Sequence, residues 1–230
     1  LPYSYILHQE YKKEKKGLKL KKVLCGILLG TMLFSTPVMA AETNENFVAW
    51  EDLKTYSEEI GEKYNIDPYI LQALTENESR LYIKAENGDC KGITQINIKY
   101  HAKRMETLGI TDIYDPYSNL LVCADYLSDL KAEKDDIYYI LMRYNMKTST
   151  ANDMYEKGEI SNYADSIVKR ASELSLNDLR AAKTAAKEQA DQEAKEQKQN
   201  DALAESERRI STGMDGTLPK GGAALWTEWT

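Results

Sequence analysis

The stretch Asn65–Ser79 reads NIDPYILQALTENES, and its pattern predicts a helix. Asp67 followed by Pro68 is a good helix start, because an aspartate can cap the first turn and proline fits the first helical position. The apolar residues that follow form one helical stripe: Ile70, Leu71 and Leu74. Glu78 lies four residues beyond Leu74, so it falls on the same stripe.

The position of Glu78 favours an unusual carboxyl group. A glutamate on a buried stripe is partly desolvated, so its pKa should rise and it can hold a proton near neutral pH. Protonation of a glycosidic oxygen requires such an acid. The alternative is an ordinary helix-terminal glutamate that is solvated or salt-bridged, and position alone favours that alternative.

Helical spacing continues outward from this stretch, from Phe47 to about Leu174. Asp115 followed by Pro116 predicts another capped helix start. No convincing run of period-two strands is present, so residues 46–174 are predicted to form a single all-α domain. Residues 175–230 form a tail rich in Ala, Lys, Glu and Gln that favours helix but lacks an apolar seam. It is predicted to be a solvated helix or a flexible spacer rather than a coiled coil.

The first forty residues resemble an export signal. A basic stretch precedes an apolar run from Val23 to Phe34, and small residues follow it. This predicts a signal peptide cleaved after Ala40 or Ala41, and the alternative is an uncleaved anchor. The apolar run is shorter than the ~20 residues that a membrane-spanning helix needs. We therefore expect an exported protein, either secreted or associated with the cell envelope.

Charge and cysteine content sharpen this picture. The 230 residues carry 30 basic and 37 acidic groups, a formal charge of −7. Residues 1–40 hold 7 basic and 2 acidic groups, so the exported chain would carry −12. This acidic balance argues against a nucleic-acid partner. The exported chain keeps Cys90 and Cys123, which could form one disulfide. The alternative is a free Cys123 that acts as a small hydrophobic residue on a helix face.

The remaining chemistry is that of carboxylates. Beyond the leader His101 is the only histidine, and there is no HExxH motif, two-histidine metal site, GxSxG motif or Gly-rich phosphate loop. A zinc hydrolase is therefore excluded, and no cofactor is expected.

Three motifs in order resemble a known family. They are LTENES at Leu74–Ser79, GITQI at Gly92–Ile96, and Tyr144-Asn145. Together they look like the soluble lytic transglycosylase (SLT) domain, a family of peptidoglycan-cleaving enzymes with a lysozyme-like α fold. The resemblance covers about residues 46–174, and Tyr163 resembles the late tyrosine motif of the family.

The resemblance implies a role for each matching residue. Glu78 would be the catalytic acid and then the base, supported by Ser79. Gln95 would line the sugar groove, Tyr144 and Asn145 would orient Glu78 and the substrate, and Tyr163 would face the cleft. Gln95 and Asn145 could instead tie loops together, and both tyrosines could be core residues. The sequence departs from the family at Thr94, where methionine is usual, and at Lys147, where glycine is usual.

The implied reaction needs one carboxyl group, because the substrate supplies the nucleophile. Glu78 would protonate the oxygen between N-acetylmuramic acid and N-acetylglucosamine, and the muramyl 6-hydroxyl would close a 1,6-anhydro ring. The rival is hydrolysis, as in goose-type lysozymes, with water positioned by Glu86 or Asp89. Another class is a non-catalytic glycan-binding protein. The expected partners are peptidoglycan glycan strands and an envelope-spanning secretion or conjugation machine. The enzyme itself is expected to be a monomer.

Overall fold

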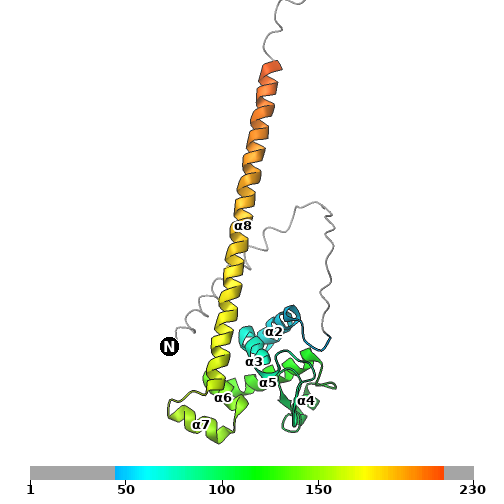
Figure 1. Cartoon of the computed structure of the whole chain (residues 1–230), viewed down its shortest axis with the longest axis vertical. Coiled ribbons are helices and arrows are strands. Elements are labelled where there is room, and N and C mark those ends of the chain that lie inside the picture. Colours follow the sequence, from blue (N-terminus) through cyan, green and yellow to red (C-terminus); the bar gives the residue numbers. More distant parts are fainter. Residues whose placement is uncertain (1–44, 215–230) are drawn as a thin grey trace, which may run out of the picture. The chain divides into compact units, whose positions relative to one another are not determined.

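A computed structural model of the chain describes residues 45–214, with side chains as far as residue 209. The expected signal peptide in residues 1–40 therefore lies outside the described residues. One compact unit ends at Asp178, and a second begins at Leu179. In chain order the elements are α2 Trp50–Tyr64, α3 Pro68–Ser79, β1 Glu86–Asn87, β2 Cys90–Lys91, β3 Ile96–Asn97, α4 Ala102–Thr107, α5 Pro116–Glu133, α6 Ile137–Asn145, α7 Thr148–Glu156 and α8 Asn162–Met214 (Figure 1).

The predicted all-α class is confirmed, with one small addition. The three strands form an antiparallel sheet in the order β1-β2-β3, in which Glu86 pairs with Lys91 and Cys90 with Asn97. Each strand is only two residues long, so it cannot show the alternating pattern that identifies a strand in a sequence. The sheet is in effect a folded loop between α3 and α4.

Both predicted helix starts are correct. α3 begins at Pro68, and the Asp67 carboxylate accepts a hydrogen bond from the Tyr69 amide at 2.9 Å. α5 begins at Pro116, and the Asp115 carboxylate accepts one from the Ser118 amide at 2.8 Å. In each case the cap satisfies an amide that the first helical turn leaves unpaired.

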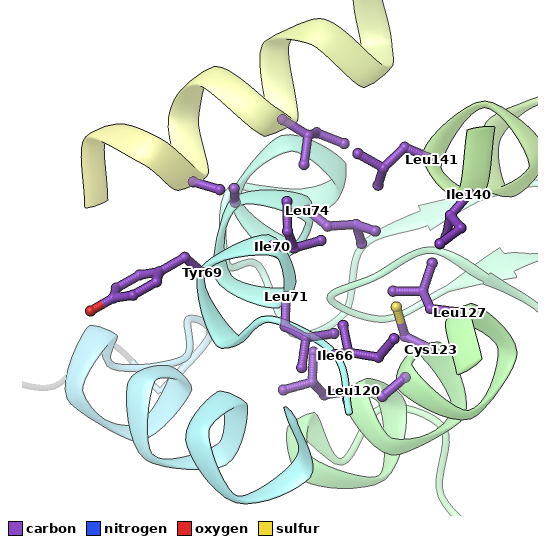
Figure 2. Packing of buried hydrophobic residues seen from close by; sticks show 14 of the residues in the cluster. Ile66, Tyr69, Ile70, Leu71, Leu74, Leu120, Cys123, Leu127, Ile140 and Leu141 are labelled. Atoms are coloured by element: carbon purple, nitrogen blue, oxygen red, sulfur yellow. The ribbon is translucent and has the colours of Figure 1, made fainter. Parts of the chain in front are cut away.

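α3 runs through the centre of the hydrophobic core. Its residues Leu71 and Leu74 are completely buried. Around them lie side chains from α5 and α6, including Leu120, Leu127 and Leu141 (Figure 2). α2 packs against both α3 and α5. Because apolar neighbours surround α3, the end of this helix holds Glu78 in a defined position.

Polar contacts fix the first part of α8 to α2 and α3. Arg170 forms a two-bond ion pair with Glu76, at 2.7 Å from Nε to Oε2 and 3.2 Å from Nη2 to Oε1. Asp178 accepts a hydrogen bond from the Tyr69 hydroxyl at 3.1 Å and pairs with Lys54 at 2.8 Å. Arg170 and Asp178 lie seven and fifteen residues beyond Tyr163, so all three project from one face of the helix.

Beyond residue 178 the α8 helix is polar and solvated. Residues 180–209 are exposed, in agreement with the absence of an apolar seam in the sequence. Among the residues that the structure describes, no helix combines the length and hydropathy needed to span a membrane.

Candidate active site

Glu78 occupies the last turn of α3 and is half-buried. Burial raises the pKa of its carboxyl group, although a hydrogen bond from the Tyr163 hydroxyl acts in the opposite direction. The structure thus agrees with the rise in pKa expected from the apolar stripe. A carboxyl group with a raised pKa can hold a proton near neutral pH and donate it.

Tyr163 is the residue that contacts Glu78 directly. Its hydroxyl group donates a hydrogen bond to Oε1 of Glu78, from the first turn of α8 across 85 residues of sequence. Burial and the nearby Glu78 charge raise the pKa of Tyr163 far above its usual value, so the phenol stays protonated. It can therefore donate to the carboxylate at neutral pH.

The loop that carries Gln95 is fixed by Asn119, a completely buried residue of α5. Its side-chain amide group donates to the Lys91 and Ile113 carbonyl groups, both at 2.9 Å. Its oxygen accepts bonds from the amide and the hydroxyl group of Thr94, at 2.8 and 2.6 Å. Thr94 therefore does not face a substrate, and the departure from the usual methionine serves this buried clamp.

Gly92 is required by the same clamp. Its φ is +77°, and a Cβ added there would come within 2.2 Å of Nδ2 of Asn119. No other residue leaves room for that amide group. Gln95 closes the turn, since its backbone amide and its side-chain Nε2 both donate to the Gly92 carbonyl group, at 3.1 and 2.9 Å.

Backbone strain also gathers here. Arg80, Leu81 and Gln95 have φ of +51°, +69° and +54°, a region that L-residues rarely adopt. Two of them directly follow the helix that carries Glu78, and the third is the predicted groove residue. Strained backbone of this kind persists where the surrounding structure enforces it, and it concentrates at functional sites.

Tyr144 lies near Glu78 but is not bonded to it. Its hydroxyl group donates to the Thr94 carbonyl oxygen at 2.7 Å, which ties α6 to the Gln95 loop. Burial raises its pKa well above the usual value, and the nearby Glu78 charge adds to the effect. The hydroxyl group of Tyr144 thus supports the loop. The family resemblance predicted that Tyr144 would orient Glu78, but the residue bonded to Glu78 is Tyr163.

The other two predicted site residues differ in environment. The Ser79 hydroxyl group is half-buried and donates to the Thr75 carbonyl oxygen at 3.2 Å, within its own helix. Asn145 is exposed at the last residue of α6, free to reach a ligand. Lys147, two residues further, has φ of −59° and is the N-cap residue directly before α7, so the turn does not need the glycine that the family usually has.

The disulfide considered from the sequence is not formed. Cys90 and Cys123 are both free thiols. Cys123 is completely buried on α5 near Leu127 (Figure 2), and burial raises its pKa to about 12. Cys90 is half-buried in β2, where burial and the Glu78 charge raise its pKa. The alternative, Cys123 as a small hydrophobic residue, is therefore correct.

The two carboxylates that could position water both have cationic partners. Glu86 is exposed and accepts bonds from Lys91 and from the Tyr114 hydroxyl group, which lower its pKa. Asp89 pairs with Lys99 at 3.1 Å. Neither carboxyl group is buried as Glu78 is. Of these three residues, Glu78 is therefore the one suited to act as a general acid.

His101 has no role in this constellation. It is buried, and burial together with the charge of Arg104 lowers its pKa to about 4. Its Nδ1 accepts a bond from Arg104 at 3.3 Å. Across residues 45–214 no cluster of three or more histidine, cysteine or acidic side chains could hold a metal ion.

Sequence reasoning missed the role of Asn119 and the ion pair of Arg170 with Glu76. Gly92, in the loop that Asn119 clamps, is a sequence signal for the close approach of this side chain. The ion pair between Arg170 and Glu76 has no such signal in the sequence, because the two residues are 94 positions apart.

The helical domain, with a half-buried glutamate at the end of α3, agrees with the lysozyme-like α fold. Residues 55–165 match the family model described as Transglycosylase SLT domain, so this region of the chain is similar to that family. Domains of this family bind the glycan strands of peptidoglycan and cleave them. No curated protein matched the sequence.

Proposed function

We propose that this protein is a lytic transglycosylase that cleaves the bond between N-acetylmuramic acid and N-acetylglucosamine, with Glu78 as its single acid and base. The observation that carries the proposal is the half-buried Glu78 carboxyl group, with its raised pKa and its phenol partner Tyr163. The family match supplies the substrate class.

In the first step, Glu78 donates its proton to the glycosidic oxygen, and the bond from that oxygen to the muramyl anomeric carbon breaks. Burial raises the pKa of the carboxyl group and so favours its protonated form before the step. Once the proton has left, the Tyr163 hydroxyl group is already aimed at the new carboxylate. A hydrogen bond to a charged oxygen is stronger than one to a neutral group, so this contact strengthens as the reaction proceeds.

In the second step, the carboxylate of Glu78 takes the proton of the muramyl 6-hydroxyl group. The freed oxygen bonds to the anomeric carbon and closes the 1,6-anhydro ring. Glu78 ends the cycle protonated, and no water is consumed. One carboxyl group therefore serves both steps, whereas most glycosidases need two.

Hydrolysis is the rival reaction, and the environment of Glu86 and Asp89 favours the proposal over it. A water-activating base needs a free lone pair near the reacting carbon. Glu86 is held by Lys91 and Tyr114, and Asp89 by Lys99. The hydrogen bonds from Lys91 and Tyr114 lower the pKa of Glu86 and so make it a weaker base.

A non-catalytic glycan-binding role is the other alternative. Recognition of a neutral sugar gains nothing from a carboxyl group whose burial raises its pKa, since that burial has a free-energy cost at neutral pH. The desolvation of Glu78 thus supports catalysis rather than binding alone.

The proposal includes the location of the reaction. The basic and apolar pattern of residues 1–40 supports export to the compartment that holds peptidoglycan. Residues 46–174 carry 15 basic and 23 acidic groups, so anionic wall polymers would not attract them, and groove contacts rather than net charge should hold the glycan. Local opening of the wall for a secretion or conjugation machine is a role of this kind.

Digestion of purified peptidoglycan tests the proposal. The wild-type protein should release anhydromuropeptides, and Glu78→Gln should lower the rate by about a hundredfold to ten-thousandfold, the usual contribution of a general acid. Glu106→Gln is the matched control, because Glu106 is an exposed residue of α4, and it should retain the wild-type rate. Unchanged release by Glu78→Gln would refute the assigned acid.

A further inference from the structure

Tyr100 is the most solvent-accessible of the exposed large hydrophobic residues within the described part of the chain, at 72%. It lies in the turn between β3 and His101, the N-cap residue of α4. An isolated exposed aromatic residue on a protein surface needs no explanation. Tyr100 differs because its backbone and its ring are both held in place.

The backbone of Tyr100 is anchored by Asn97 in β3. The Oδ1 atom of Asn97 accepts bonds from the amides of Lys99 and Tyr100, at 3.1 and 3.0 Å. The Asn97 carbonyl group accepts one from the amide of His101 at 2.9 Å. These three bonds fix the chain on both sides of the exposed ring.

The ring of Tyr100 rests against two other rings. Its centroid is 4.8 Å from that of His101 and 6.1 Å from that of Tyr126, with edge-to-face angles of 81° and 66°. These contacts hold the ring in place, while its exposure of 72% leaves most of its surface in water. A tyrosine that is already ordered loses little conformational entropy when it binds a ligand.

A row of rings leads from Tyr100 to the candidate active site. The Tyr126 ring is 5.8 Å from that of Tyr144, whose hydroxyl group bonds to the Thr94 carbonyl oxygen. Exposure falls along the row, since Tyr100 is exposed while Tyr126 and Tyr144 are half-buried. The exposed ring is therefore the outer end of an aromatic cluster that begins beside the Gln95 loop.

We propose that Tyr100 is a stacking platform for one pyranose ring of the glycan strand, beyond the two sugars joined by the cleaved bond. The inference rests on the proposed function. The C–H face of a pyranose is apolar and matches the open face of a fixed tyrosine ring, while the tyrosine hydroxyl group can bond to a sugar hydroxyl group. The platform would hold long strands and would contribute little to short ones.

Kinetics on two substrates test this subsite. Tyr100→Ala should raise KM for peptide-free glycan strands about tenfold, which corresponds to about 1.4 kcal/mol. It should leave kcat within about twofold, because uniform binding does not alter the chemical step. On the tetrasaccharide of alternating N-acetylglucosamine and N-acetylmuramic acid, both constants should stay near the wild-type values. Tyr100→Trp, which keeps an aromatic face, should retain the affinity for long strands.

Tyr117→Ala is the matched control. Tyr117 also packs edge-to-face on a tyrosine, Tyr56, at 5.4 Å, but outside this row. It should not change the ratio of the two KM values. An equal loss on both substrates with Tyr100→Ala, or no loss on either, would overturn the platform.

The two proposals can fail separately. An inactive wild-type protein would refute the proposed function but would leave the platform open to a binding test. In that case, co-sedimentation with insoluble peptidoglycan should be compared between two proteins. The double variant with Tyr100→Ala and Glu78→Gln should bind less than the single variant Glu78→Gln. Equal sedimentation would refute the platform.

Discussion

Replacing Tyr163 with phenylalanine should move the alkaline limb of the pH–rate profile to higher pH. The change removes the hydroxyl group that donates to Oε1 of Glu78 and keeps the aromatic ring. That bond lowers the pKa of Glu78, while burial raises it. Without the bond, the effect of burial is unopposed and the pKa rises further.

The size of the shift follows from the strength of the bond. A hydrogen bond to a charged group contributes about 1.5 kcal/mol at the lower end of its range, which suits the half-buried Glu78. Since 1.36 kcal/mol corresponds to one pKa unit, the pKa should rise by about one unit. Activity requires protonated Glu78 and falls as pH rises through its pKa. The limb of kcat/KM that reports this loss should therefore move upward by about one unit.

The assay is kcat/KM on solubilised glycan strands across the pH range, with the fold checked by circular dichroism at each pH. The rate at the optimum should also fall, because the new carboxylate loses its donor. Tyr144→Phe is the control, since that hydroxyl group bonds to the Thr94 carbonyl oxygen and not to Glu78. A limb that stays in place in Tyr163→Phe, or moves to lower pH, would refute the role given to this hydrogen bond.

Three further outcomes follow from named contacts. Glu78→Gln should raise the melting temperature at pH 7, because a carboxyl group whose folded pKa is raised destabilises the fold as pH rises above its ordinary pKa, and the gain should vanish at pH values below that ordinary pKa; a gain that persists in acid would contradict this cause. Arg170→Ala should lower the free energy of unfolding by about 1 kcal/mol, at the upper end for a partly exposed pair, whereas Arg170→Lys should keep part of it, as urea titration would show. Asn119→Ala should cost about 3 kcal/mol by the same titration, because it leaves buried amide and carbonyl groups unpaired, and a loss below about 1 kcal/mol would argue against the clamp.

The features that could be predicted from the sequence depend on local signals. The starts of α3 and α5 follow from Asp67-Pro68 and Asp115-Pro116, since cap and proline act within one turn. The partial burial of Glu78 follows from its place on the stripe of Leu71 and Leu74. Spacing within one helix is enough for these inferences.

The remaining features depend on contacts between distant segments. The bond between Tyr163 and Glu78 joins residues 85 apart, and only the family resemblance pointed to Tyr163 at all. The three strands are held by pairing across a loop and not by alternation, so their residues carry no strand pattern. The number of cysteines alone could not predict a disulfide. Two cysteines allow a bridge, but the bridge forms only where the fold brings their side chains together.

The central claim is that Glu78 serves one substrate-assisted reaction in which no water is consumed. Digestion of peptidoglycan in water enriched in heavy oxygen, followed by mass spectrometry of the muropeptides, tests it most directly. We predict anhydromuramyl ends that carry no heavy oxygen and are absent with Glu78→Gln. Reducing muramyl ends that carry one heavy oxygen would contradict the claim and identify a hydrolase.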